Sequence, residues 1–390
     1  MIILTIDYLV VIFIMNIAGI YIHVPFCKTK CIYCDFYSIT GQDERIDNFV
    51  NMLICEIEQC PIDASNWTFD TIFIGGGTPS LLNAQQMEKI ISTLDNSYNL
   101  SKIKEFTIEA NPGEAPKEKL IDFYSLGINR LSIGVQSFKA ESLQFLSRIH
   151  SADDVFRTFK SARDAGFQNI NCDLIYNIPG QSLEDWQNDL NTLIQLNPEH
   201  ISAYSLTVEQ NTKLFEFVHN KSIIMPVDEL HQQFNDITYS ILRNNSYQQY
   251  EISNYSKSNK ECFHNLHYWE NDFYLGFGPS AHGYDGIKRW NNFSNLDKYI
   301  SLLKNSESPI ETFDHNTEIK RINEIIGFGL RIVNGFDLLK IPLDLRKVFD
   351  KQLQQAQLKF PAMIIEENNR LRLTQEGMNF ADAIAVELMV

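Results

Sequence analysis

Short apolar runs alternate with longer amphipathic stretches from residue 17 to residue 206. The short runs have the length of strands, and the longer stretches carry apolar residues at the spacing of a helix that packs on one side. This alternation predicts βα units with parallel strands. We expect strands at 19–24, 71–74, 106–109, 130–134, 171–175 and 200–206, and helices at 43–59, 84–94, 117–126, 152–165 and 183–196.

Six βα units predict an α/β fold with a partial, TIM-like (βα)6 barrel, because a closed TIM barrel needs eight units. In open and closed barrels alike, the reactive groups lie at the carboxyl ends of the strands. The polar and glycine-rich motifs of this chain directly follow the expected strands. We therefore expect the functional site along that edge of the barrel.

The alternation stops after Leu206. Residues 228–242 have a helical pattern, a dense aromatic stretch covers 263–284, and a small, mostly helical pattern begins near residue 317. A β-wing before a helix is indicated near residue 370, so this last part is expected to be winged-helix-like. We expect four parts: an N-terminal extension (1–16), a core barrel (17–210), a region that completes the barrel (211–315) and a helical C-terminal domain (316–390).

The first residues need a separate interpretation. Residues 8–14 are almost wholly apolar, but no Lys or Arg occurs before Lys28, so the charged start of a signal peptide is missing. A membrane span would need ~20 apolar residues. We interpret the segment as a start codon placed too early, with Met15 as the true start; a membrane-associating segment is the alternative.

Charge and cysteine usage narrow the function classes. The net charge of -16 argues against binding to nucleic acid and leaves only peripheral contact with membranes. Three of the seven cysteines lie within eight residues, which is typical of metal-binding thiolates in a reducing compartment. We expect a cytoplasmic protein in which Cys55, Cys60 and Cys172 are buried without a role.

The three clustered cysteines form the strongest motif, Cys27-Lys-Thr-Lys-Cys31-Ile-Tyr-Cys34, directly after the first expected strand. Cysteine thiolates hold iron–sulfur clusters, and three of them leave one iron of a four-iron cluster open. Structural zinc is the alternative, but it would need a fourth Cys or His. A c-type haem attachment is ruled out because Asp35 follows Cys34. We expect a [4Fe–4S] cluster on Cys27, Cys31 and Cys34.

This loop, which opens with Tyr21-Ile-His-Val-Pro-Phe-Cys27, resembles radical S-adenosylmethionine (SAM) proteins. The resemblance is to the branch that contains the oxygen-independent coproporphyrinogen III oxidases and the HemW haem chaperones, and it covers nearly the whole chain from Ile17. Each matching stretch is weak alone, but their ordered set is specific. Those stretches are 75–80, 109–112, 130–138, 146–150, 172–175, 178–181 and 373–377.

The resemblance implies that SAM binds the open iron and is cleaved to a 5'-deoxyadenosyl radical, with a flavodoxin- or ferredoxin-like protein as a candidate electron donor. Glycines at 75–77 would allow close approach of a ligand, and Glu109 could accept hydrogen bonds from ribose; a tight turn and a turn cap are the alternatives. In the oxidases some matching positions contact a second SAM, so the number bound stays open. The expected SAM contacts are Tyr21, Tyr33, Gly76, Gly77, Thr78, Glu109, Gln136, Arg148 and Asp173.

Two departures favour the chaperones over the oxidases. The oxidases have another cysteine two positions beyond the third cluster ligand, where this chain has Phe36. They also carry an N-terminal extension, whereas little sequence precedes the first expected strand here. Decarboxylation of coproporphyrinogen III is therefore in doubt, although such an oxidase remains the alternative function.

A second constellation is Cys262-Phe-His264-Asn-Leu-His267-Tyr268-Trp269, which resembles the HNxxYW stretch associated with haem binding in HemW. Imidazole and thiolate can ligate haem iron, and aromatic rings offer flat surface to a porphyrin. His264 is the first choice of ligand, and Cys262 is a second or covalent point of attachment. The alternative is an aromatic patch that seals the open end of the barrel, with hydrogen-bonded histidines. We expect a protein that binds haem as cargo and passes it to an acceptor protein, which the sequence does not identify.

Overall fold

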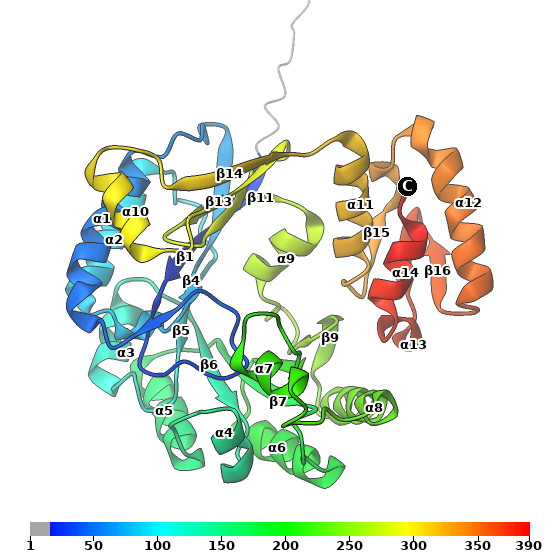
Figure 1. Ribbon diagram of the computed structural model, residues 1–390, viewed down its shortest axis with the longest axis horizontal. Coiled ribbons are helices and arrows are strands. Elements are labelled where there is room, and N and C mark those ends of the chain that lie inside the picture. Colours follow the sequence, from blue (N-terminus) through cyan, green and yellow to red (C-terminus); the bar gives the residue numbers. More distant parts are fainter. Residues whose placement is uncertain (1–15) are drawn as a thin grey trace, which may run out of the picture.

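The computed structural model describes residues 16–390 (Figure 1). The interpretation of Met15 as the true start therefore lies outside the described residues. Within residues 16–390, no helix combines the length and the apolar character that crossing a membrane requires.

Six parallel strands form the centre of the molecule and follow one another across the sheet in chain order. Each contains one of the six strands expected from the sequence, apart from one residue at the end of the last strand, so the predicted series of βα units is confirmed. The strands are β1 (Asn16–Val24), β4 (Trp67–Gly76), β5 (Glu105–Ala110), β6 (Arg130–Gln136), β7 (Ile170–Tyr176) and β8 (His200–Ser205).

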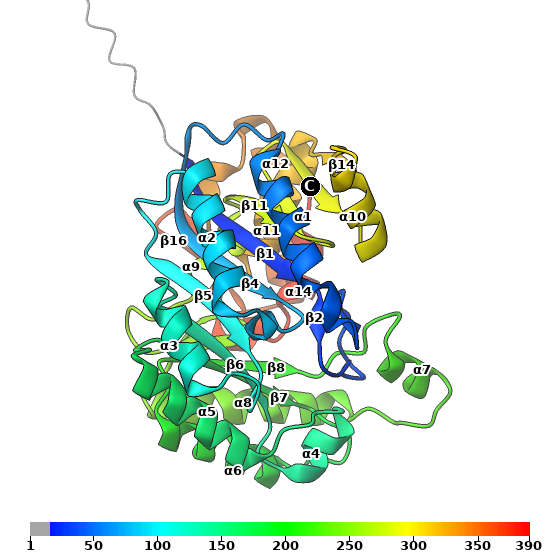
Figure 2. The ribbon, with the colours of Figure 1, turned by 90° about the vertical axis from the view of Figure 1, so that its left-hand side faces the viewer.

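Helices cover the outer face of this sheet (Figure 2). Three of them begin with a capping box, in which the side chains of Asn83, Ser151 and Ser182 accept hydrogen bonds from the first turn. The five expected helices are all present, and a short helix, α4, is added before α5. The helices are α1 (Ile46–Glu58), α2 (Ala84–Ser97), α3 (Lys117–Ser125), α4 (Ala140–Phe145), α5 (Ala152–Ala165) and α6 (Leu183–Leu196).

The inner face of the sheet is polar. Successive side chains of a strand point to opposite faces, so Phe106 and Ile108 of β5 join the core while Thr107 and Glu109 point into the barrel. Parallel strands are usually apolar on both faces. A polar inner face indicates that the interior of this barrel serves polar ligands as well as packing.

The sheet continues beyond the six strands at both edges, to twelve strands in all. The sequence pattern missed these additions because they are short and mixed in character. One edge adds β11 (Phe273–Phe277), which is parallel to β1, and then β12 (His282–Tyr284), β13 (Lys288–Asn292) and β14 (Ile310–His315). The other edge adds β10 (Asn254–Ser256) and β9 (Gln248–Glu251).

Four helices belong to the stretch after β8. α8 (Asp228–Asn244) confirms the helix expected at 228–242, and α10 (Leu296–Lys304) packs on α1. α7 (Lys213–His219) lies beside the loop that follows β1 (Figure 2), where Leu214 N donates to Ile32 O at 2.9 Å. α9 (Phe263–Glu270) packs against β4 and β1.

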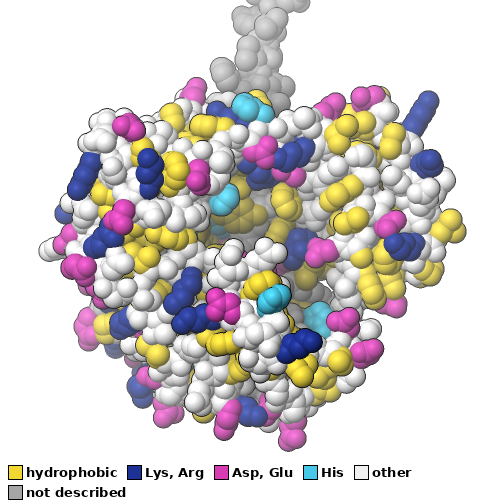
Figure 3. Space-filling view, viewed as in Figure 1, with side chains coloured by type: hydrophobic (Ala, Val, Ile, Leu, Met, Phe, Trp, Pro, Cys, Tyr) yellow, Lys and Arg dark blue, Asp and Glu magenta, His cyan; other side chains and the backbone are white. Residues whose placement is uncertain are grey.

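The last part of the chain has its own hydrophobic core, built from residues between Ile322 and Leu388. Its helices are α11 (Glu318–Gly329), α12 (Leu343–Lys359), α13 (Gln375–Met378) and α14 (Ala381–Leu388). A small sheet joins them, formed by β15 (Phe336–Asp337), β16 (Ile364–Glu367) and β17 (Arg370–Leu373). The β16–β17 hairpin is the expected wing. Figure 3 shows a hollow between this part and the barrel; the four-part division itself stays a prediction.

Arg289 joins the barrel to the C-terminal helices. Its guanidinium binds both carboxylate oxygens of Glu324 on α11, each at 3.0 Å. It also donates to Tyr274 Oη at 3.0 Å and lies 4.0 Å above the ring of Tyr284. One side chain of β13 therefore connects two strands of the sheet with α11.

Candidate functional site

The cysteine loop follows β1 and is fixed by hydrogen bonds to its own chain. Ile39 N donates to Pro25 O at 2.7 Å, and Lys30 Nζ donates to Phe36 O at 2.5 Å. His23 Nε2 lies 2.7 Å from Tyr37 O. Because a carbonyl only accepts, the proton of this imidazole is on Nε2, and burial lowers its pKa to about 4. A neutral histidine of β1 therefore holds the cysteine loop through the carbonyl of Tyr37.

A chain of hydrogen bonds connects two of the three thiols. Thr78 Oγ1 donates to Cys27 Sγ at 3.6 Å, and Arg148 Nη1 donates to Cys31 Sγ at 3.6 Å. Asn111 joins the two donors, because its Nδ2 donates to Thr78 Oγ1 at 2.9 Å and its Oδ1 accepts from Arg148 Nη2 at 2.6 Å. We call these three donor residues, Thr78, Asn111 and Arg148, the thiol bridge. The sequence pointed to Thr78 and Arg148 only as SAM contacts and gave Asn111 no role.

These residues fit a four-iron cluster with three protein ligands. Donors to sulfur, as in the thiol bridge, are a recognised feature of such clusters. A Cβ on Gly77 would lie 2.6 Å from Phe26 O and 3.0 Å from Cys27 Sγ, so only glycine leaves the thiol its space. Burial raises the pKa of the Cys27 thiol and that of Cys34, the latter to about 11, so metal binding has to displace protons. Among residues 16–390, no three His, Cys, Asp or Glu side chains converge on the position of a single metal ion.

Glu109 ends β5 beside the glycine turn that follows β4. Its Oε2 accepts from Gly76 N at 3.1 Å, and a Cβ on Gly75 would lie 3.0 Å from the same oxygen. Desolvation inside the barrel, followed by the charge of Asp173, raises the pKa of Glu109 to about 8. The carboxyl group and the open backbone of the turn therefore face the same space.

The other expected SAM contacts lie at two levels of the barrel. Gln136 ends β6 in the left-handed region, with φ of 64°, close to the thiol bridge. Asp173 lies deeper, within β7, where Ser132 Oγ and Asn171 Nδ2 donate to it. Tyr21 lies within β1 and its hydroxyl pairs with His23 Nδ1 at 3.0 Å. Tyr33 belongs to the cysteine loop and packs toward α7. The structure brings the glycine turn, Glu109, Gln136 and Arg148 together at the strand ends, with Tyr21 and Asp173 below them.

The expected haem ligand, His264, lies inside the barrel. It is 1% exposed, and its ring meets Gly19, on which a Cβ would lie 2.9 Å away. Its Nδ1 pairs with Thr71 Oγ1 at 2.9 Å and its Nε2 with Tyr268 Oη at 2.8 Å. His264 therefore has no free nitrogen for iron in this conformation. The aromatic patch to which it belongs closes the barrel near the amino ends of the strands, which we call the floor, and not at the open end.

His267 and Cys262 of the same stretch are also hydrogen-bonded within the protein. His267 pairs with Asp70 at 2.7 Å and with Asp272 at 2.9 Å. Burial alone would lower its pKa, but these two carboxylates raise it to about 9. The thiol of Cys262 is buried and donates to Glu105 at 3.4 Å.

Glu105 also accepts from the backbone N–H groups of Phe263 and His264, at 2.9 and 3.1 Å, and so caps α9. Trp269 points to the other side and packs on Phe328 of α11. The histidines are thus hydrogen-bonded within the protein, as in the alternative to haem ligation that the sequence left open. Ligation of haem by His264 would require α9 to leave the barrel.

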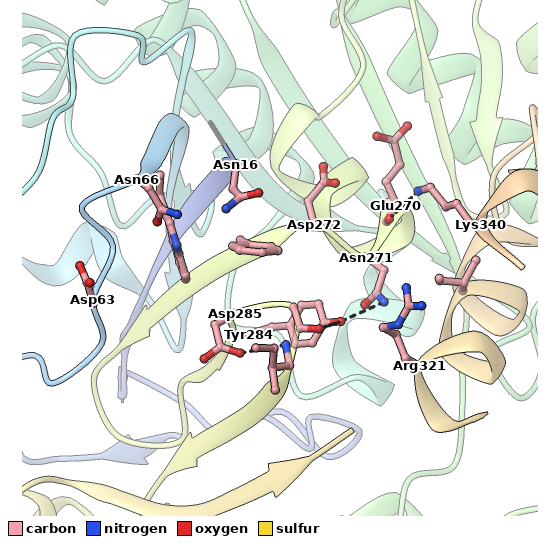
Figure 4. A pocket seen from close by; sticks show the side chains of 15 residues that line it. Asn16, Asp63, Asn66, Glu270, Asn271, Asp272, Tyr284, Asp285, Arg321 and Lys340 are labelled. Carbon is pink, nitrogen blue, oxygen red and sulfur yellow. Dashed lines mark hydrogen bonds between the residues drawn. The ribbon is translucent and has the colours of Figure 1, made fainter. Parts of the chain in front are cut away.

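A cavity of about 610 Å³ lies at the amino ends of the strands (Figure 4). Asn16 and Trp67 at the starts of β1 and β4 line one side, and Arg321 and Lys340 of the C-terminal part line the other. Figure 2 shows that the start of β1 and the cysteine loop are at opposite edges of the molecule. This floor cavity is therefore separate from the cysteine site.

Known proteins resemble the chain in sequence and in fold. The profile described as "Radical SAM superfamily" matches residues 21–193. "Heme chaperone HemW" of Bacillus subtilis (strain 168) is 37% identical over 316 residues, which cover 81% of this chain and 83% of the relative. The protein of the same name from Escherichia coli (strain K12) is 40% identical over 267 residues, which cover 68% of this chain and 69% of the relative.

One solved structure matches the fold closely. It is the radical SAM enzyme coproporphyrinogen III oxidase (HemN) from Escherichia coli, with a TM-score of 0.83, over 96% of this chain and 90% of that chain. The two sequences are only 22% identical, so this similarity establishes the fold alone.

Proposed function

The chain belongs to the HemW family of radical SAM proteins, and on that premise we propose that it is a haem chaperone, which binds haem as cargo and passes it to an acceptor protein. The observation that carries this proposal is the similarity to curated haem chaperones over most of the chain. The fold alone would not separate a chaperone from an oxidase.

We assign Cys27, Cys31 and Cys34 to a [4Fe–4S] cluster, the group that radical SAM proteins use together with SAM. When bound, this group supplies one-electron reductive cleavage of SAM. The protein's own part is to orient these groups. The thiol bridge donates hydrogen bonds to two of the cysteine sulfurs, and the glycine turn leaves space for SAM to approach the backbone closely. Glu109 is placed to accept hydrogen bonds from the ribose hydroxyls.

Phe36 argues against the oxidase reaction. Its side chain is 61% exposed in the cysteine loop and offers no thiol at the position where the oxidases have one. A phenyl ring can neither ligate metal nor exchange a proton. We therefore infer that the protein keeps the cluster and the SAM site but does not decarboxylate coproporphyrinogen.

The cargo needs an acceptor and the cluster needs an electron donor. We propose a flavodoxin- or ferredoxin-like donor, and an acceptor that takes haem directly from the protein. None of the seven cysteines, all of which lie within residues 16–390, forms a disulfide. Free thiols support a reducing compartment such as the cytoplasm.

Anaerobic reconstitution followed by two assays tests this function. The protein should take up about four irons and four sulfides per chain, bind haem with a saturable Soret band, and release no CO₂ from coproporphyrinogen III in the presence of SAM and a reductant. Cys31→Ala should lose the iron. Turnover of coproporphyrinogen without saturable haem binding would replace the chaperone with the oxidase.

A further inference from the structure

A groove of about 640 Å³ lies beside the cysteine loop, between α4 and the start of α5. This size falls within the range of small-molecule and cofactor sites. Thr29 of the cysteine loop forms one wall, and Phe138, Leu143 and Ile149 provide apolar surface. Ile149 is 66% exposed at the rim, so the apolar surface is open to a ligand from outside.

His150 lines this groove and differs from the other buried histidines. Of the five buried histidines in residues 16–390, four have both ring nitrogens engaged, namely His23, His200, His264 and His267. His150 has one engaged nitrogen, because its Nε2 pairs with Val135 O at 3.0 Å and no described residue hydrogen-bonds to its Nδ1.

The chemistry of His150 suits a metal ligand. Since Val135 O can only accept, the proton is on Nε2 and the lone pair is on Nδ1. Burial, followed by the charge of Arg148, lowers the pKa of His150 to about 4, so the lone pair is free of a proton at neutral pH. A histidine whose second nitrogen donates to a backbone carbonyl is the usual arrangement of a metal-ligating imidazole.

The remainder of the groove matches the cargo. A porphyrin offers two flat apolar faces, which Phe138, Leu143 and Ile149 can cover, and its propionates are anionic. Arg148 lines the same groove and adds positive charge beside it, while its guanidinium stays bonded to Cys31 and Asn111. Asp153 is the one acidic residue of the lining. The two histidines of α9 offer no comparable ligand, because their ring nitrogens are all paired inside the protein.

We propose that this groove holds the haem cargo, with Nδ1 of His150 as an axial ligand of the iron. The proposal rests on the proposed function, which supplies haem as the cargo. Because Thr29 belongs to the cysteine loop, haem in this groove would lie on the same edge of the barrel as the cluster and SAM. The floor cavity would place it at the opposite edge.

Titration of reconstituted full-length protein with ferric haem tests the site. The wild type should saturate near one haem per chain, with the spectrum of histidine-ligated iron. His150→Gln keeps a donor for Val135 O but offers no imidazole, and it should weaken binding at least tenfold and abolish that spectrum. Ile149→Glu, an exposed change at the rim, should also weaken binding. Added imidazole should restore a nitrogen-ligated spectrum to haem-loaded His150→Ala.

His315→Ala, at an exposed histidine on β14, is the matched control and should titrate like the wild type. Iron content should be unchanged in all variants, which separates loss of haem from loss of the fold. Wild-type affinity in His150→Gln would overturn the proposal while leaving the chaperone function in place, as would binding that only His264→Ala or Arg321→Ala removes. A wild type that binds no haem would overturn the proposed function as well.

Discussion

At the scale of single residues, Asn111 has a role that no motif assigned to it. Its amide group spans Thr78 and Arg148, and through them it fixes the donors to two cysteine sulfurs. An amide suits this place because it donates from one end and accepts at the other. Neither a carboxylate nor an aliphatic side chain could hold both neighbours in the same orientation.

Asn111→Ala should lower the reduction potential of the cluster. Hydrogen bonds to cluster sulfurs stabilise the more negative, reduced state, and the two donors lose their common support in this variant. An EPR-monitored redox titration should show a more negative midpoint with unchanged iron content. Asn99→Ala, at an exposed asparagine, is the control and should keep the wild-type midpoint. A midpoint unaffected by Asn111→Ala would show that the thiol bridge is only structural.

Glu109→Gln should weaken SAM binding by about 1.5–3 kcal/mol, the scale of a hydrogen bond to a charged group. The pKa of about 8 adds a signature, because the hydroxyls of ribose favour the carboxylate form, which predominates only above that value. Wild-type affinity for SAM should therefore rise as the pH increases through 8, whereas Glu109→Gln should lack this rise. Isothermal titration at pH 6.5 and 8.5 measures both effects, and identical pH profiles would contradict them.

At the scale of elements, α9 is held in the barrel by charge. His267⁺ lies between Asp70 and Asp272, and Glu105 caps the first turn of the helix. The helix is therefore fastened at both ends to the starts of β4 and β5.

This fastening predicts a loss of stability in mildly alkaline solution. The pKa of His267 is about 9 in the folded protein, above the ordinary value of 6.5, so its contribution is complete below pH 6.5 and is lost as the pH rises through 9. Over that window the free energy of unfolding should fall by roughly 3 kcal/mol. Urea unfolding at pH 6 and 9 measures the fall, which should be much smaller in His267→Gln.

The sequence predicted elements whose pattern is local and missed those whose pattern is not. The six central strands and the five helices on their outer face show a clear periodicity, and all were found. α9 was seen only as an aromatic stretch, because its two buried residues are His264 and His267, so no apolar stripe marks the helical period. β12 is too short to show any pattern.

The candidate site shows the same difference between local features, which could be predicted, and distant contacts, which could not. The spacing of the cysteines is local, so the loop could be predicted. The three hydrogen bonds that link Asn111 and Arg148 to Thr78, to each other and to Cys31, by contrast, span between 33 and 117 positions of the chain. The free nitrogen of His150 also depends on a distant contact, to Val135 fifteen positions earlier. No motif records such pairings, so they emerge only from the fold.

At the scale of the whole molecule, the C-terminal helices depend on a few contacts with the barrel edge. Arg289→Met should break the bidentate pair with Glu324 and the bond to Tyr274, at a cost of roughly 2–4 kcal/mol, because these groups are largely buried. Urea unfolding gives the magnitude, and faster proteolysis near residues 315–318 would show that the C-terminal part detaches first. Lys320→Met removes an exposed pair with Asp314 and should cost under about 1 kcal/mol. Equal effects of the two variants would contradict this assignment.

The hydrogen bonds that fix the cysteine loop have a consequence for how the protein would fare in a living cell. Pro25, Tyr37 and Phe36 supply the backbone acceptors of these bonds, and none of the bonds uses a thiol, so loss of metal should leave them in place. Under iron starvation we therefore expect a folded, empty carrier that escapes degradation. When iron returned, this reserve could take up clusters at once, without the delay of new protein synthesis.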